Sequence, residues 1–145
     1  MSQRVKVFLD TSVLIAASDS NHEKHAESRP LLAAATPQNC ACGAHSLAET
    51  YANLSFLKGG RQQRPETALK LVEQVASRMM VVSLTPDEYL VAIRGAANSR
   101  VAGGTIYDAL LVACARKVEA ERIYTWNARH FQLVAPDLAE RIVTP

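Results

Sequence analysis

Short apolar segments alternate with longer helical patterns along this 145-residue chain, and this alternation restricts its fold more than any other feature. The segments that we predict as strands cover residues 5–9, 39–43, 79–84, 122–125 and 141–144. The clearest of them are apolar on both faces, which indicates a parallel sheet covered by helices on each side. The sequence therefore predicts one three-layer α/β/α domain with a short-stranded parallel sheet, spanning residues 1–145.

Helical patterns fill the intervals between the predicted strands. The helices that we predict cover residues 13–17, 22–35, 46–58, 65–77, a segment from 85 onward, and 105–118, with a turn at 127–131. Ser46 and Glu49 have the spacing of a capping box, so we expect the helix to begin at Ser46. No repeat, linker or low-complexity tract divides the chain.

Composition excludes several classes of protein. With 48% hydrophobic and 21% charged residues, the chain is neither disordered nor fibrous. No apolar run approaches the roughly 18 residues of a membrane span, and Asp10 comes too early for a secretory leader, so we expect a cytoplasmic protein without membrane contact. Three cysteines, Cys40, Cys42 and Cys114, form a poor disulfide framework, and we interpret them as reduced core residues. A net charge of +2 is too small to indicate nucleic-acid binding by itself.

Four oxygen-bearing side chains are predicted to meet at one edge of the sheet. Asp10 ends the first strand, Asn127 follows the strand at 122–125, Glu49 lies one helical turn beyond the strand at 39–43, and Asp108 lies in the first turn of the most apolar helix. Ligands of parallel α/β sheets bind at the carboxyl ends of the strands. The four residues are therefore candidates for a shared site.

Each candidate also has a purely structural interpretation. Asp10 is a possible helix cap, Asn127 a turn residue, and both Glu49 and Asp108 fit the capping-box spacing. Asp108 is the hardest to explain in this way, because an ionised carboxylate among apolar neighbours needs a partner. A divalent cation would satisfy Asp10, Glu49 and Asp108 together, and an all-oxygen ligand set favours Mg²⁺ or Mn²⁺ over zinc.

Other polar residues give weaker signals. His22 and His25 have a metal-site spacing without a third ligand nearby, and a solvated helix end is the simpler interpretation. Trp126, beside the predicted site, suits base stacking as well as turn packing. Three basic residues flank a Gly-Gly loop and fit either phosphate contact or ordinary solvation: Lys58, Arg61 and Arg64.

The ordered motifs of the chain resemble a PIN domain of the VapC toxin group. The similarity rests on residues 7–12 (VFLDTS), on Ala48-Glu49, on residues 104–110 (GTIYDAL) and on residues 125–131 (TWNARHF). The resemblance implies a metal-dependent ribonuclease using Mg²⁺ or Mn²⁺. It also implies a cytosolic toxin, commonly dimeric, that a small antitoxin inhibits by occupying the active-site groove.

Carried over residue by residue, the resemblance assigns Asp10, Glu49 and Asp108 as metal-binding acids. Asn127 falls where many members have a fourth acid, so the number of metal ions stays open. The hydroxyl residues that match positions lining such a site are Thr11, Ser12 and Thr125. His130 replaces an acid of some relatives, and we assign it no role.

The function predicted from the sequence is metal-assisted hydrolysis of RNA phosphodiester bonds by a toxin of a toxin–antitoxin pair. The alternative is a non-catalytic module of the same fold that binds RNA or protein, and turnover of RNA distinguishes the two. A phosphoacceptor domain is disfavoured because residues 79–84 contain no aspartate and no lysine follows residues 122–125. Leu54, Phe56 and Leu57 either line a groove for an antitoxin helix, together with residues 65–77, or pack inside the monomer.

Overall fold

Five short strands form one parallel sheet in the computed structural model, which describes residues 4–56 and 63–145. The order across the sheet is β3-β2-β1-β4-β5, and every neighbouring pair is parallel. The strands are β1 (Val7–Leu9), β2 (Cys40–Gly43), β3 (Met80–Val82), β4 (Arg122–Tyr124) and β5 (Ile142–Val143). The central strand β1 thus lies between β2 and β4, and the residues that follow these three strands meet at one edge.

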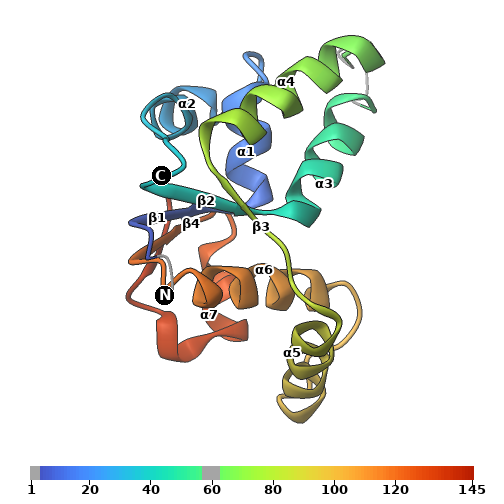
Figure 1. Ribbon diagram of the computed structural model, residues 1–145, viewed down its shortest axis with the longest axis vertical. Coiled ribbons are helices and arrows are strands. Elements are labelled where there is room, and N and C mark those ends of the chain that lie inside the picture. Colours follow the sequence, from blue (N-terminus) through green and yellow to red (C-terminus); the bar gives the residue numbers. More distant parts are fainter. Residues whose placement is uncertain (1–3, 57–62) are drawn as a thin grey trace.

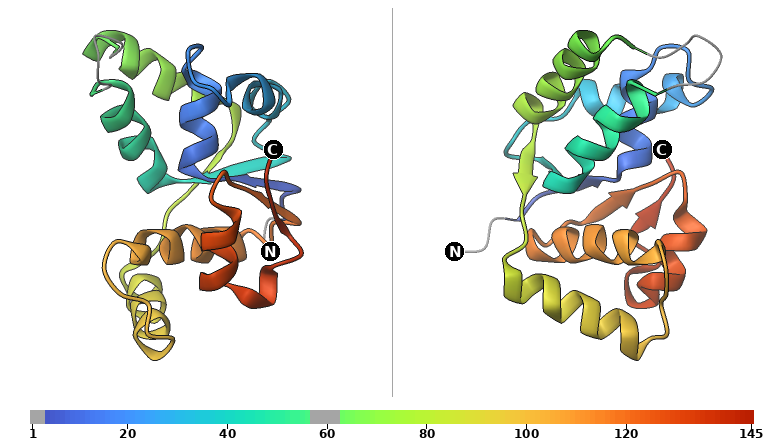
Figure 2. Two further views of the ribbon diagram at one scale, coloured as in Figure 1. Left: turned by 180° about the vertical axis from the view of Figure 1, so that it is seen from behind. Right: turned by 90° about the vertical axis from the view of Figure 1, so that its right-hand side faces the viewer.

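Helices cover both faces of the sheet, as Figures 1 and 2 show. One layer contains α1 (Thr11–Ser18), α2 (His25–Ala33), α3 (Ala44–Leu54) and α4 (Pro65–Arg78). The other contains α5 (Pro86–Asn98), α6 (Thr105–Lys117) and α7 (Ala128–Val134), followed by a short 3₁₀ helix, η1 (Pro136–Leu138). This is the three-layer α/β/α arrangement that the sequence predicts.

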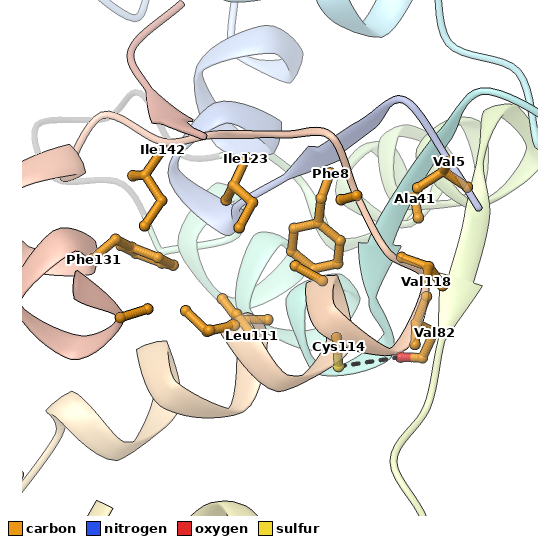
Figure 3. Close-up of a cluster of buried hydrophobic side chains, with 14 residues drawn as sticks. Val5, Phe8, Ala41, Val82, Leu111, Cys114, Val118, Ile123, Phe131 and Ile142 are labelled. Carbon is orange, nitrogen blue, oxygen red and sulfur yellow. Dashed lines mark hydrogen bonds between the residues drawn. The ribbon is translucent and has the colours of Figure 1, made fainter. Parts of the chain in front are cut away.

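Two hydrophobic clusters, one on each face, hold the layers together. Phe8, Ile123 and Leu111 belong to the cluster beneath α6 and α7, where Phe131 also packs (Figure 3). Leu9 belongs to the cluster on the opposite face, which includes residues of α1, α2 and the C-terminal part of α4. Adjacent strand residues alternate between faces, so strands that are apolar throughout serve both clusters. The sheet is therefore anchored on both sides and gives its carboxyl edge a fixed position.

All three cysteines are buried and free, as predicted. Burial raises the pKa of Cys40 and Cys42 to about 12 and that of Cys114 to about 11. The thiolate is the reactive form of cysteine, so these side chains act as small core residues.

Three details of the helices differ from the sequence prediction. The third helix begins at Ala44, so Ser46 and Glu49 do not form a capping box, and it ends at Leu54 with Ser55 as its C-cap, so the predicted extension to Lys58 is wrong. The last helix, predicted as a turn at 127–131, continues from Ala128 to Val134.

Within residues 4–56 and 63–145, no helix combines the length and apolarity needed to cross a membrane.

Candidate functional site

Asp10 is fixed at the carboxyl end of β1. It is the N-cap of α1, as one of its two interpretations expected, and it is only 3% exposed. Its Oδ2 accepts hydrogen bonds from Ser12 Oγ at 2.7 Å, from Thr125 Oγ1 at 2.8 Å and from the Ser12 backbone N–H at 3.3 Å. Its own N–H donates to the Tyr124 carbonyl oxygen of β4, at 3.0 Å. These bonds hold one carboxylate oxygen in place, although no cationic side chain of the described residues pairs with Asp10.

Ser12 and Thr125 extend this arrangement to the segment that follows β4. Ser12 Oγ accepts from the Trp126 N–H at 3.0 Å, and Thr125 Oγ1 accepts from the Asn127 N–H at 2.9 Å. The carboxylate and the two hydroxyls thus connect the ends of β1 and β4, which are neighbours only in the folded chain. Both hydroxyl residues are hydrogen-bonded to the Asp10 carboxylate.

Glu49 reaches the same edge from α3. The hydroxyl of Thr11 lies 3.2 Å from Glu49 Oε1 and 2.7 Å from the hydroxyl oxygen of Ser46, which is fully buried. His45 Nε2 lies 3.5 Å from the same carboxylate oxygen, on the same helix. The buried Ser46 hydroxyl therefore joins α1 to α3 and supports the position of Glu49. The sequence did not indicate this role, because the S-x-x-E spacing of Ser46 and Glu49 favoured a capping box.

Asp108 lies in the first turn of α6, where Gly104 is the N-cap and no side chain caps the helix. Its Oδ2 is 2.8 Å from His130 Nδ1, and its side chain is 24% exposed. Burial and the negative charges of Asp10 and Glu49 raise the pKa of Asp108, while His130 opposes the shift. The three acids are therefore close enough for their charges to interact. His130, to which the sequence assigned no role, is the partner of Asp108.

A stacked ring pair connects the helices that carry Glu49 and Asp108. The rings of His45 on α3 and Tyr107 on α6 are 5.4 Å apart between centroids and nearly parallel, at 7°. Figure 1 shows α3 above the sheet and α6 below it, with the first turns of both near the same end of the sheet. The stack is a direct contact between the two helix layers at the candidate site.

Asn127 immediately precedes α7 and is exposed. Its backbone is bound to Thr125, but its side chain makes no capping bond to the helix. The side-chain amide is thus open to solvent, two residues after the Thr125 hydroxyl that binds Asp10.

The three carboxylates do not form a ready-made metal cage. In the described part of the chain, no three His, Cys, Asp or Glu side chains converge closely enough to hold a metal ion. Each acid instead directs an oxygen to a neighbour: Asp10 to two hydroxyls, Glu49 to Thr11, and Asp108 to His130. The donor set is nevertheless chemically suited to Mg²⁺ or Mn²⁺, since it consists of carboxylates whose mutual repulsion a cation would relieve.

The remaining histidine and basic candidates have local partners or lie outside the described residues. His22 Nδ1 accepts from the Lys24 N–H, and His25 Nδ1 lies 2.8 Å from the Ala16 carbonyl oxygen, so both are used locally. Arg64 is an exposed partner of Glu66, at 3.8 Å. Lys58 and Arg61 lie outside the described residues.

Comparisons with known proteins identify relatives over almost the whole chain. A family model described as the PIN domain matches residues 7–135. Ribonuclease VapC27 of Mycobacterium tuberculosis is 31% identical over 134 residues, which cover 92% of this chain and 90% of that protein.

Solved structures agree on the fold. VapC20 of Mycobacterium tuberculosis, described as a sarcin-ricin loop cleaving toxin, matches with a TM-score of 0.69 and 21% identity, over 86% of this chain and 92% of that one. DNA-bound VapBC from Salmonella typhimurium matches with a TM-score of 0.66 and 21% identity, over 97% and 98%. At this identity the two structures establish the architecture.

Proposed function

Because this chain belongs to the PIN-domain family, we propose that it is an endoribonuclease of the VapC toxin group that hydrolyses RNA phosphodiester bonds with Mg²⁺ or Mn²⁺. The observation that carries the proposal is the proximity of three acids from separate elements, whose charges interact at the carboxyl edge of the sheet. Burial and the other two charges disfavour ionisation of Asp108. A site that gathers like charges at a cost to folding is typical of metal-assisted chemistry.

In this proposal Asp10, Glu49 and Asp108 hold the cation, and Asn127 offers a neutral oxygen at the fourth position. When bound, the cation supplies Lewis acidity toward water and toward the phosphoryl oxygens. Ser12 and Thr125 fix Asp10, Thr11 fixes Glu49, and His130 fixes Asp108. Since these contacts occupy one oxygen of each acid, a bound cation would need the other oxygens or small rotations of the side chains.

The proposed partners are RNA, a small antitoxin protein and a second copy of this chain. The proposed location is the cytoplasm, and residues 1–145 would act as one nuclease domain. Phe56, at the end of α3, is 81% exposed, which supports an apolar contact there with the antitoxin. Leu54 is fully buried and belongs to the interior, and Leu57 lies outside the described residues.

Cleavage of total cellular RNA, with the ends mapped by sequencing, tests the proposal. The wild type should cut RNA only with Mg²⁺ or Mn²⁺, and folded Asp108→Ala should lose this activity. Asp87→Ala, which removes an exposed acid on α5, is the matched control and should cut normally. Metal-dependent RNA binding without turnover by the wild type would favour the non-catalytic module, and normal cleavage by Asp108→Ala would refute the assigned site.

A further inference from the structure

A pocket of about 660 Å³, lined mainly by polar residues, opens beside Ser12, which is bonded to Asp10. Its walls come from the end of α1, the segment between α1 and α2, Asn53 near the end of α3, and Trp126 after β4. None of the residues assigned above to cation binding lines it. The pocket is therefore a separate compartment next to the proposed catalytic acids.

Ser12 forms the boundary between the pocket and those acids. Ser12 lines the pocket, and its hydroxyl donates to Asp10 Oδ2 at 2.7 Å and accepts from the Trp126 N–H at 3.0 Å. A molecule in the pocket thus lies one side chain away from Asp10. An RNA whose phosphate is held at the acids would have a neighbouring nucleotide within reach of this space.

The aromatic wall of the pocket is held in position. Trp126 Nε1 donates to Ser28 Oγ at 2.8 Å, and Ser28 is fully buried. Lys24 Nζ lies 4.8 Å from the centre of the indole ring, as a cation above an aromatic face. Displacement of this one flexible side chain would free the ring for stacking on a base and leave the ammonium available to a phosphate.

The other walls carry both hydrogen-bond donors and acceptors. Asn21 and Asn53 present amides, and His22 presents a ring whose Nδ1 accepts from the Lys24 N–H, which leaves Nε2 as the donor in the neutral ring. Asp19 is 4% exposed, and its Oδ1 accepts from the Asn21 N–H at 3.0 Å. An apolar peptide side chain would leave such groups unpaired, whereas the edge of a nucleobase can pair with them.

We propose that this pocket binds the base of an RNA nucleotide adjacent to the cleaved phosphate and so contributes to the choice of cleavage sequence. The base packs against Trp126, the amides of Asn21 and Asn53 contact its edge, and Lys24 binds a phosphate of the same strand. This inference rests on the ribonuclease function proposed above.

Trp126 itself is the reporter for the first test, because it is the single tryptophan of the chain. A short single-stranded RNA is titrated into the protein in EDTA, which prevents metal-dependent cleavage, and tryptophan fluorescence is recorded. A saturable change is expected, and Asn53→Ala and Lys24→Ala should each weaken binding severalfold. Lys70→Ala on the exposed side of α4, which removes the same charge as Lys24→Ala, is the control and should bind as the wild type does.

Cleavage mapping is the second test and separates this inference from the proposed function. Asn53→Ala and Trp126→Phe should lower kcat/KM about fivefold or more, the scale of one base contact, and should alter base preference at a single position beside the cut. Unchanged kcat/KM and unchanged cut sites in both variants would overturn the inference while leaving the nuclease intact. A fluorescence change with an antitoxin peptide but not with RNA would also overturn it. Absence of cleavage by the wild type would instead refute the proposed function, and the RNA titration would still test the pocket.

Discussion

At the scale of single residues, the raised pKa of Asp108 makes the stability of the protein depend on pH. Burial and the charges of Asp10 and Glu49 raise its pKa in the folded protein, so the fold retains this proton to higher pH than the unfolded chain does. The metal-free protein should therefore lose stability as pH rises from the usual range of an aspartate through the raised pKa. Below that range Asp108 is protonated in both the folded and the unfolded protein, so its ionisation does not lower the free energy of unfolding.

Asp108→Asn removes the ionisation and should raise the melting temperature of the metal-free protein at neutral pH, with the difference shrinking as pH falls. Thermal unfolding in EDTA across this pH range measures it. Asp137→Asn is a control of opposite sign, because Arg116 lowers the pKa of Asp137 and stabilises its charged form. An Asp108→Asn protein that melts below the wild type at neutral pH would show that His130 outweighs the repulsion.

Asn127 is the uncharged member of the proposed cation site. Asn127→Asp adds a fourth negative charge beside the proposed cation, and a close ion pair at an effective dielectric near 20 is worth a few kcal/mol before desolvation. Manganese affinity, measured by isothermal titration calorimetry, should therefore increase about tenfold or more. Unchanged affinity in the folded variant would place Asn127 outside the ligand shell.

At the scale of elements, the distance between α3 and α6 depends on the absence of a side chain at Gly43, the last residue of β2. A Cβ at this position would lie 2.8 Å from Leu111 Cδ2 of α6, and Leu111 is itself buried in the core. The close approach brings α6 onto β2, next to the start of α3. Overpacking here would disturb the separation of Glu49 and Asp108.

Gly43→Ala should accordingly destabilise the protein by about 1–3 kcal/mol, the usual cost of overpacking, and should reduce nuclease activity. Gly95→Ala is the matched control, since a Cβ there meets no atom within 4 Å. It lies inside α5 and should stabilise the protein by about 0.5–1 kcal/mol. Chemical denaturation measures both, and equal effects of the two substitutions would refute the packing argument.

The elements themselves were largely predictable because their signals are local. The apolar strands and the helix starts predicted near residues 65 and 85 agree with the structure, in which Pro65 begins α4 and Thr85 forms the capping box of α5. The Ser46–Glu49 spacing was misleading, because the same pattern arises when a buried serine bonds to another helix. The contact between Asp108 and His130 depends on how α6 packs against α7, and no local pattern contains that information.

At the scale of the whole molecule, the sheet order explains why distant residues share one site. Because β1 lies between β2 and β4, Asp10 after β1 bonds to the hydroxyl of Thr125 after β4, Glu49 approaches from the helix that follows β2, and α6 supplies Asp108 from the opposite layer. The sequence predicted that these residues share an edge, since parallel strands end together. It could not predict the orientation of the carboxylates or the pocket beside Ser12, which arise from side-chain packing between elements.

The central claim is that Asp10, Glu49 and Asp108 together hold one divalent cation. Anomalous scattering from crystals soaked in Mn²⁺ tests it most directly, because manganese is located without assuming its ligands. We predict a manganese peak bounded by oxygens of all three carboxylates, with the side chains rotated from their metal-free positions, and no such peak in Asp108→Asn crystals. A soaked wild-type crystal without manganese between these acids, or with manganese only elsewhere on the protein, would contradict the claim.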